Sequence, residues 1–391
     1  MTPSALIEYD RFRSTKYFPS LDGLRAISIL AVIWYHVPEL RPLWATGFLG
    51  VHLFFVISGF LITTLLLREK SATGKISLKN FYIRRTLRIF PAYYLTLGLF
   101  LLLCLAVPDL RANGLATYIH NLPSFLTYTS NWFVYPWGPG RVVFVAAWSL
   151  ATEEQFYLFW PGIIAIGRKW YIPVIVMLLL IVANEVIKIK FGYLFFLSGQ
   201  SLPITMLNSV STAICFGCLL AYALDRPGSF SIAWKVLGQT WSPPFFMLVM
   251  GFVAVIPNND ELHVLRMFYI CTMMTLAVAS CCIRTDNLLR PILANRAVRY
   301  LGSISYGMYL YHAFGINLTD RFFGFTKPWP LLQFAAVVIS TAAIASISYW
   351  FYERYFLRLK ERFQARRSLG AISTSALADA SAEYSRLPKY N

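Results

Sequence analysis

Residues 17–37 read YFPSLDGLRAISILAVIWYHV, and this stretch decides the fold class. Most of it is apolar enough to enter a lipid bilayer, yet it contains Arg25 and His36. Eleven residues at about 100° each make about three turns, so both side chains lie on one helix face, about 16 Å apart. Ionisable residues inside a span are costly and usually face a polar interior. Both are therefore candidate functional residues, with a snorkelling arginine and a helix-end histidine as the structural alternative.

The whole chain has the composition of a polytopic membrane protein. It has 391 residues, of which 57% are hydrophobic and 14% charged, whereas soluble domains are about one quarter charged. The net charge is +17, but the basic residues lie in short clusters between apolar runs, which indicates topology rather than nucleic-acid binding. The C-x-x-C of Cys215 and Cys218 lies in an apolar run without a second ligand pair. We therefore expect packing cysteines, no bound metal and no nucleic-acid partner.

Ten segments are predicted to span the membrane. They cover residues 21–38, 47–67, 89–107, 144–166, 171–187, 203–224, 241–257, 264–283, 301–319 and 331–352. An even number of spans puts both termini on one side, and most of the 35 Lys and Arg residues then fall on the inner side, as the positive-inside rule requires. The prediction is an all-α, polytopic membrane helix bundle of about ten transmembrane helices with both termini cytoplasmic.

The chain divides into three parts on this basis. Residues 1–20 are expected to form a cytoplasmic N-terminal segment, and the first sixteen lack the apolar core of a cleavable signal peptide. Residues 21–355 form the membrane domain. Residues 356–391 form a basic cytoplasmic tail, whose small polar end is expected to be disordered.

The second span places polar side chains in apolar surroundings. His52 and Ser58 lie beside Gly50 and Gly59, small residues that let helices approach closely. Ser58 is a candidate substrate-binding residue.

Three arginines, Arg84, Arg85 and Arg88, lie within about one helical turn just before the third span. Arg85 and Arg88 are i, i+3 neighbours. Because the guanidinium fork suits phosphate oxygens, they are candidate phosphate ligands together with Arg25. The alternative is a positively charged anchor in the loop before residues 89–107, formed by an interfacial amphipathic helix.

The fourth span contains two adjacent carboxylates, Glu153 and Glu154, between aromatic residues. A buried carboxylate must be paired or protonated. Since this span runs inward and that of His36 runs outward, Glu153 and His36 can meet at similar depth. A histidine–carboxylate pair facing a hydroxyl is the usual arrangement for deprotonating an alcohol. His36, Glu153 and Glu154 are therefore candidate catalytic residues.

The ninth span places Tyr306, Tyr309 and His312 on one helix face. Tyr309 and His312 are candidate substrate-binding residues, with polar packing between helices as the alternative. The main outer segment, residues 108–143, is rich in aromatic residues, which either form an interface belt or stack on sugar rings. They include Tyr118, Tyr128, Trp132, Tyr135 and Trp137.

Five stretches together resemble the acyltransferase-3 family of integral-membrane acyltransferases. They read FPSLDGLRAISILAVIWYH, GVHLFFVISGFLI, FYIRRTLRIFP, SLATEEQFYLFWP and ISYGMYLYH. Each is weak alone, but they occur in the family's order over nearly the whole chain. The resemblance implies a ten-span bundle that takes an acyl group, often acetyl, from cytoplasmic acyl-CoA and passes it to a hydroxyl of an extracytoplasmic or membrane-linked sugar.

Individual residues match the family's motifs. Arg25 and His36 are similar to its arginine and histidine separated by ten positions, Arg85 and Arg88 fall on its R-x-x-R-I-x-P motif, and Glu153 and Glu154 fall on its S-L-x-x-E-E-Q-F-Y motif.

Two positions depart from the family's pattern. His52 replaces the acid of the usual G-V-D-L-F-F, so this chain lacks the carboxylate at that position. The last span ends Glu353, Arg354, Tyr355 where the family usually has Glu-x-Pro.

The sequence thus predicts a multi-pass O-acyltransferase of the bacterial cytoplasmic (inner) membrane. Its expected partners are acyl-CoA as co-substrate, a carbohydrate or glycolipid acceptor and membrane lipids, with no bound cofactor. Candidate acceptors are an exopolysaccharide, a lipopolysaccharide or another glycoconjugate. The alternative is a proton-coupled secondary transporter with an intramembrane His/Glu relay, although the paired half-repeats of such transporters are not evident.

Overall fold

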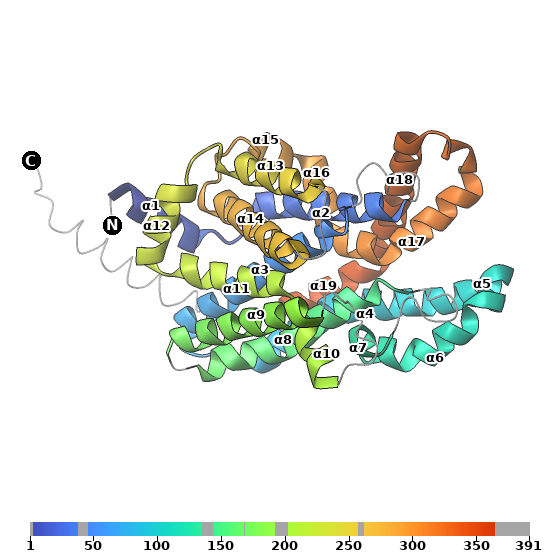
Figure 1. Ribbon diagram of the computed structural model, residues 1–391, viewed down its shortest axis with the longest axis horizontal. Coiled ribbons are helices and arrows are strands. Elements are labelled where there is room, and N and C mark those ends of the chain that lie inside the picture. Colours follow the sequence, from blue (N-terminus) through green and yellow to red (C-terminus); the bar gives the residue numbers. More distant parts are fainter. Residues whose placement is uncertain are drawn as a thin grey trace, which may run out of the picture.

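The computed structural model describes residues 3–37, 46–134, 144–167, 169–191, 202–256 and 262–363. Within these ranges all regular structure is helical and no strand occurs, which confirms the predicted fold class. Figure 1 shows the helices packed side by side in one bundle.

The helices follow one another in this order: α1 (Pro3–Ser14), α2 (Pro19–His36), α3 (Leu49–Thr73), α4 (Leu78–Ala106), α5 (Pro108–Asn113), α6 (Leu115–Leu126), α7 (Ser130–Phe133), α8 (Ala147–Ile166), α9 (Tyr171–Phe191), α10 (Leu202–Asn208), α11 (Thr212–Asp225), α12 (Pro227–Leu237), α13 (Ser242–Val255), α14 (His263–Ile283), α15 (Arg290–Leu293), α16 (Arg296–Ser303), α17 (Ser305–Phe322), the 3-10 turn η2 (Gly324–Thr326), α18 (Pro330–Ser348), the π-turn η3 (Tyr349–Glu353) and α19 (Arg354–Glu361).

Each predicted span coincides with a helix or with part of a bent helix pair. In the described chain, α3, α4, α9, α14 and the run Pro330–Glu361 are long and apolar enough to cross a bilayer. The bent pairs α1–α2, α10–α11 and α12–α13 raise the number from 5 to 8 if each pair is one span. The two remaining predicted segments coincide with α8 and α17, which carry many polar residues. The total of ten crossings and the cytoplasmic termini stay predictions.

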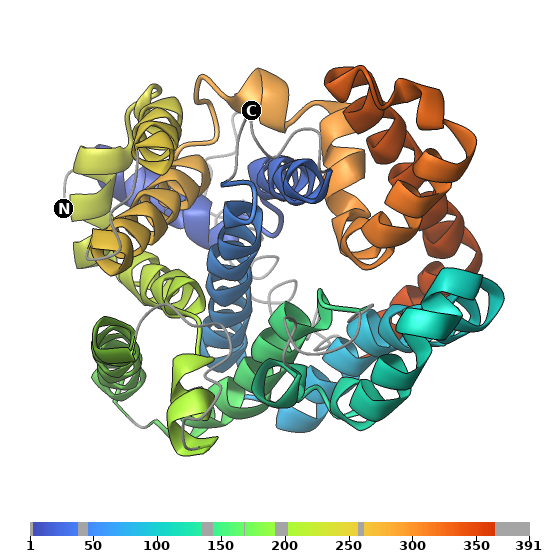
Figure 2. The ribbon, with the colours of Figure 1, turned by 45° about the vertical axis from the view of Figure 1, so that its right-hand side comes forward.

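Helix α3 lies at the centre of the bundle. Other helices surround it in Figure 2, and 83% of its most apolar window is buried. Its most extensive packing is against α11, where two glycines bring the backbones together. A Cβ on Gly59 would lie 2.2 Å from the Ile214 carbonyl oxygen, and one on Gly217 would lie 2.2 Å from the Val56 oxygen. This contact has no room for a side chain at either glycine.

Helix α4 differs from the sequence prediction at its start. We expected a loop or a separate interfacial helix before residues 89–107, but one helix begins at Leu78 and continues through Pro91. Ser77 caps it, because its hydroxyl accepts from the Asn80 N–H at 3.4 Å. Proline is tolerated in such helices because neighbouring groups satisfy the freed backbone carbonyls. Arg84, Arg85 and Arg88 therefore lie on a rigid helix rather than in a loop.

Residues 108–134 of the predicted outer segment form the short helices α5, α6 and α7. Tyr118 and Tyr128 are buried, with exposures of 1% and 7%. Both therefore belong to the packed interior and neither is an exposed surface for stacking on sugar rings. Tyr135 and Trp137 lie outside the described residues.

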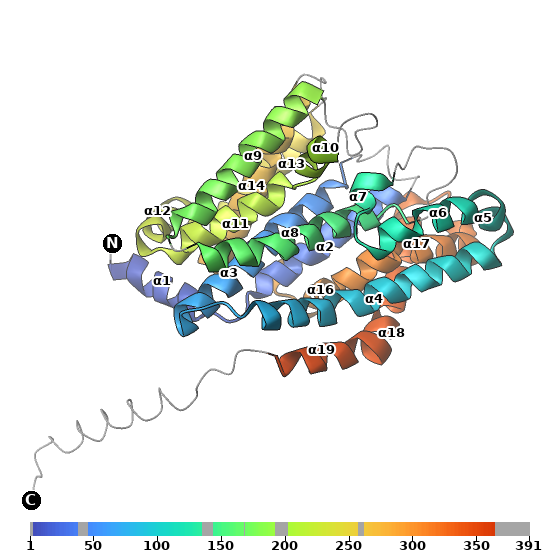
Figure 3. The ribbon, with the colours of Figure 1, turned by 90° about the horizontal axis from the view of Figure 1, so that it is seen from below.

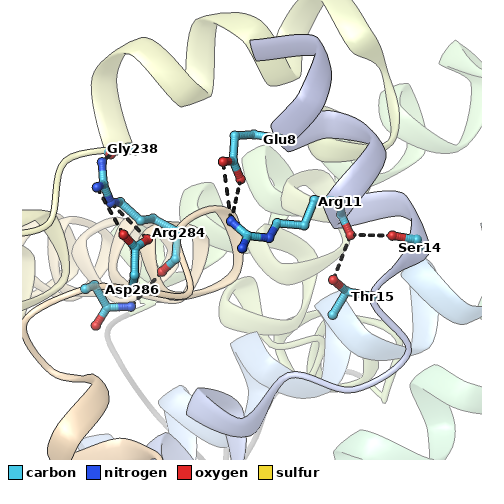
Figure 4. Close-up of polar contacts among 8 residues, drawn as sticks. Glu8, Arg11, Ser14, Thr15, Gly238, Arg284 and Asp286 are labelled. Carbon is cyan, nitrogen blue, oxygen red and sulfur yellow. Dashed lines mark hydrogen bonds and ion pairs between the residues drawn. The ribbon is translucent and has the colours of Figure 1, made fainter. Parts of the chain in front are cut away.

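Polar contacts fix the loops where α1 approaches the end of α14. In Figure 4 the Arg284 guanidinium donates to the Gly238 carbonyl oxygen at 2.8 Å and pairs with Asp286 at 3.2 Å. On α1, Arg11 pairs with Glu8 at 3.3 Å. Residues 3–14 of the predicted N-terminal segment form a helix that packs against α12 and α14.

Candidate active site

Two histidines from distant parts of the chain meet in the bundle. His36 ends α2, and His312 lies within α17. Their ring centroids are 4.8 Å apart. His312 is buried, whereas His36 is exposed. We call this region the histidine end of the bundle.

The helix backbone fixes the proton position on both rings. Nδ1 of His36 lies 2.8 Å from the Val32 carbonyl oxygen, and Nδ1 of His312 lies 2.6 Å from the Tyr309 carbonyl oxygen. Because a carbonyl only accepts, each Nδ1 carries the hydrogen and Nε2 is the acceptor nitrogen of the neutral ring. A general base that removes a proton from a hydroxyl needs this tautomer.

Glu153 lies between two hydroxyl groups. Ser58 of α3 and Tyr157 of α8 both donate to its Oε1, and the two hydroxyl oxygens also contact each other. Two donors satisfy a carboxylate that would otherwise be costly within an apolar bundle. The sequence singled out Ser58 and Glu153 separately and did not identify Tyr157. The signal was present, because Tyr157 lies at i+4 from Glu153 on the same helix face.

Tyr309 connects this carboxylate with the histidines. Its hydroxyl contacts Ser149 Oγ at 2.5 Å, and its ring centroid lies 5.7 Å from that of His312. Ser149 lies one helical turn before Glu153 on α8. The Nδ1 partner of His36 is a backbone carbonyl, so the role of Glu153 as the orienting group of that ring stays a proposal.

Three arginines gather at the opposite end of this polar region. The Arg85 guanidinium carbon lies 4.2 Å from the centre of the Tyr157 ring. Arg88 interacts electrostatically with both Arg85 and Arg25, and Arg25 pairs with Asp22 at 3.3 Å. We call this region the arginine end.

Polar groups thus form a row between the two ends. Arg85 contacts Tyr157, and Tyr157 and Ser58 contact Glu153. Ser149, one turn before Glu153 on α8, contacts Tyr309 beside His312. Along α2 the ends are about 16 Å apart, at about 1.5 Å per residue. The row and its two ends contain eight of the nine predicted site residues, all except Glu154. The chemical roles of these residues stay predictions.

Glu154 faces different side chains from its neighbour. Its charge acts on Tyr94, Tyr128 and Tyr306. Its Oε1 and the Tyr128 hydroxyl are buried without a hydrogen-bond partner among the described residues. Tyr128 has a φ of 53°, a left-handed conformation that is uncommon for such a residue, and its ring stacks on Tyr93 at 4.3 Å.

A cavity of about 60 Å³ lies beside the row. Its lining includes His52, Trp148 and the pair of Glu185 and Lys188, whose carboxylate and ammonium are 2.9 Å apart. The charge of Lys188 acts on His52. This volume is large enough to hold ordered water. His52, the departure from the family pattern, therefore lines this cavity.

Comparison with protein families gives a single assignment. A family model described as an acyltransferase domain, the acyltransferase-3 model, matches residues 18–350. The chain belongs to the acyltransferase-3 family. The match confirms the resemblance carried by the five motifs and includes every residue of the polar row, but it ends before α19.

Two similar proteins carry names that state an activity. The peptidoglycan O-acetyltransferase OatA of Listeria monocytogenes is 30% identical over 370 residues, which cover 87% of this chain and 56% of that protein. The O-acetyltransferase OatA of Staphylococcus aureus is 28% identical over 364 residues, which cover 88% of this chain and 58% of that protein. This chain therefore spans a little over half the length of these relatives. No solved structure matches it.

Proposed function

We propose that this chain is a membrane O-acyltransferase that moves an acyl group, acetyl in the first instance, from acyl-CoA to a hydroxyl of an envelope carbohydrate. The observation that carries this proposal is the polar row that connects a cluster of arginines with a pair of histidines. The arginines can bind the phosphates of an acyl donor, and the histidines can deprotonate the alcohol that accepts the acyl group.

The donor binds with its phosphates at the arginine end. Arg88 is exposed and, among the described residues, has no hydrogen-bond or ion-pair partner. Arg85 is held by the Tyr157 ring, and Arg25 by Asp22. Held guanidinium groups lose little freedom when an anion binds, which favours them as phosphate ligands. The predicted topology puts this end at the cytoplasm, where acyl-CoA is made.

The thioester then extends along the row to the histidine end. The acceptor hydroxyl gives its proton to Nε2 of His36, and its oxygen attacks the thioester carbonyl carbon. The C–S bond breaks as the ester C–O bond forms, and the departing sulfur takes up the proton. His312 packs against His36 and positions that ring. Direct transfer is the simplest sequence of steps because it needs no further nucleophile.

Glu153 acts from the middle of the row. The hydroxyls of Ser58 and Tyr157 hold its carboxylate, and its negative charge stabilises the positive charge that develops on His36 during proton transfer. Glu154 is the second candidate catalytic carboxylate, placed among tyrosines.

The acceptor is an extracytoplasmic saccharide. One relative is named a peptidoglycan O-acetyltransferase, which supports a polymeric or membrane-linked carbohydrate over a soluble metabolite. The exposed position of His36 at the end of α2 suits a large acceptor that approaches from outside. The site of action is the cytoplasmic membrane of a bacterium.

Transfer by the purified protein tests this function. The full chain in lipid nanodiscs receives radiolabelled acetyl-CoA and envelope glycan, and label in the glycan is measured with CoA thiol release. We expect label with wild type and none with His36→Ala. The matched control is His120→Ala, an exposed histidine of α6. Equal labelling by His36→Ala and wild type would remove the proposed base, and proton-coupled uptake without CoA consumption would favour a transporter.

A further inference from the structure

Helix α19 lies along α4 near the arginine end. The π-turn η3 redirects the chain after α18, and Figure 3 shows α19 beneath α4. One contact fixes its far end: Arg84 of α4 donates to the Phe363 carbonyl oxygen at 2.9 Å. Arg84 itself pairs with Glu69 of α3 at 3.1 Å. Because Arg84 is committed to these contacts, it acts as a support for α19 rather than as a phosphate ligand.

This arrangement brings a lysine close to the arginines. Lys360 of α19 lies three residues before Phe363, whose carbonyl oxygen Arg84 contacts, and its charge interacts with those of Arg84, Arg85 and Arg88. It is half-buried, and among the described residues it has neither a hydrogen bond nor an ion pair. The carboxylate nearest in sequence is Glu361, which interacts with it only through space.

Like charges repel one another, and the repulsion grows where the surroundings are poor in water. Arg85 and Arg88 lie one turn apart on α4, α19 packs along that helix, and in the described chain no carboxylate lies at ion-pair distance from Arg85, Arg88 or Lys360. Glu353 reaches Arg88 only through space, since its Oε1 accepts from the Ser348 hydroxyl at 2.9 Å. Such a cluster is stabilised when an anion with several negative oxygens binds.

We propose that Lys360 is a further ligand of the donor's phosphate groups and that α19 completes the donor site. This inference rests on the proposed acyl-CoA binding at the arginine end. It assigns a role to a segment beyond residue 350, where the match to the family model ends. The chemical class recognised is the phosphate portion of coenzyme A, because the acyl group and its thioester lie toward the histidines.

The test compares two donors that differ in phosphate content. Acetyl-CoA carries the phosphates, whereas S-acetyl-pantetheine presents the same thioester without them. Steady-state transfer by the full chain in nanodiscs gives kcat and KM for each donor. With Lys360→Gln we expect KM for acetyl-CoA to rise about fivefold to tenfold with little change in kcat, the effect of one lost charge-assisted contact. With S-acetyl-pantetheine the variant should match wild type.

Arg358→Gln is the matched control. It removes one positive charge from the same helix two residues away, on a different face, and its side chain is exposed. Its KM for acetyl-CoA should stay at the wild-type value. If Lys360→Gln leaves KM for acetyl-CoA unchanged, as Arg358→Gln should, or raises KM equally for both donors, Lys360 is not a phosphate ligand.

Arg88→Gln separates this inference from the function on which it rests. If Arg88→Gln raises KM for acetyl-CoA while Lys360→Gln does not, the arginine site stands and the role of α19 is wrong. If neither variant changes KM for acetyl-CoA, donor binding at the arginine end is itself wrong.

Discussion

The imidazole rings of His36 and His312 lie 4.8 Å apart, although they belong to α2 and α17. Each ring is held by a carbonyl of its own helix, which leaves Nε2 as the acceptor nitrogen on both. Two neutral rings in this state cannot donate to each other. A proton that reaches one ring is therefore shared with a neighbouring acceptor, which makes the pair suited to receive the proton of an attacking hydroxyl.

The first prediction concerns His312. His312→Gln should lower kcat about tenfold or more with a small change in KM, because the ring of His36 loses its packing partner. Parallel kinetics of His120→Gln, at an exposed site on α6, should match wild type. An unchanged kcat in His312→Gln would show that His36 works without it.

The second prediction separates the charge of Glu153 from its hydrogen bonds. Glu153→Gln removes the charge and should lower kcat more than Tyr157→Phe, which removes one donor but keeps the ring under Arg85. Tyr157→Phe should mainly lower thermal stability, since loss of one hydrogen bond to a charged group costs about 1.5–3 kcal/mol. Both kcat and Tm are measured for the two variants. A larger loss of kcat in Tyr157→Phe than in Glu153→Gln would contradict the electrostatic role of Glu153.

The third prediction tests the packing of α3 against α11. Gly217→Ala places a Cβ 2.2 Å from the Val56 carbonyl oxygen, so it should destabilise the bundle by about 1–3 kcal/mol. Gly251→Ala on α13 meets nothing within 4 Å and should be neutral or stabilising by about 0.5–1 kcal/mol, because alanine favours helix. Unfolding in detergent, followed by tryptophan fluorescence, measures both. Equal stability of the two variants would mean that the backbones do not touch as described.

The fourth prediction concerns topology. Lys75 lies between α3 and α4, Asn113 ends α5, and both are exposed. The natural cysteines are buried, so a membrane-impermeant maleimide should report on introduced cysteines alone. In intact cells we expect labelling of Asn113→Cys, and labelling of Lys75→Cys only after permeabilisation. The reverse pattern would invert the bundle and place the arginine end outside.

Much of the fold follows from the sequence because apolar runs and clusters of basic residues are local signals. The helix α4 shows the limit of that reasoning, since the sequence predicted a loop or a separate interfacial helix before residues 89–107, where the structure has one helix that begins at Leu78. Even so, the i, i+3 spacing of Arg85 and Arg88 already placed both on one face. Motifs therefore located most of the site's residues, but not the contacts among them.

The pairings of the site depend on tertiary packing, which no local pattern reports. Ser58 and Glu153 were separate candidates, and only the crossing of α3 and α8 joins them. Lys360 had no motif at all, because its significance comes from the placement of α19 beside α4. The i+4 spacing puts Tyr157 beside Glu153 on one helix face, but only tertiary packing brings its hydroxyl to Ser58 of α3.

The central claim is that His36 acts as the base in transfer of an acyl group to an envelope carbohydrate. Proton NMR of envelope and secreted glycoconjugates tests it most directly, in a strain that lacks the gene and carries either wild type, His36→Ala or His120→Ala at matched membrane levels. The account predicts an O-acetyl signal restored by wild type and by His120→Ala but absent with His36→Ala. An O-acetyl signal restored equally by His36→Ala would contradict it.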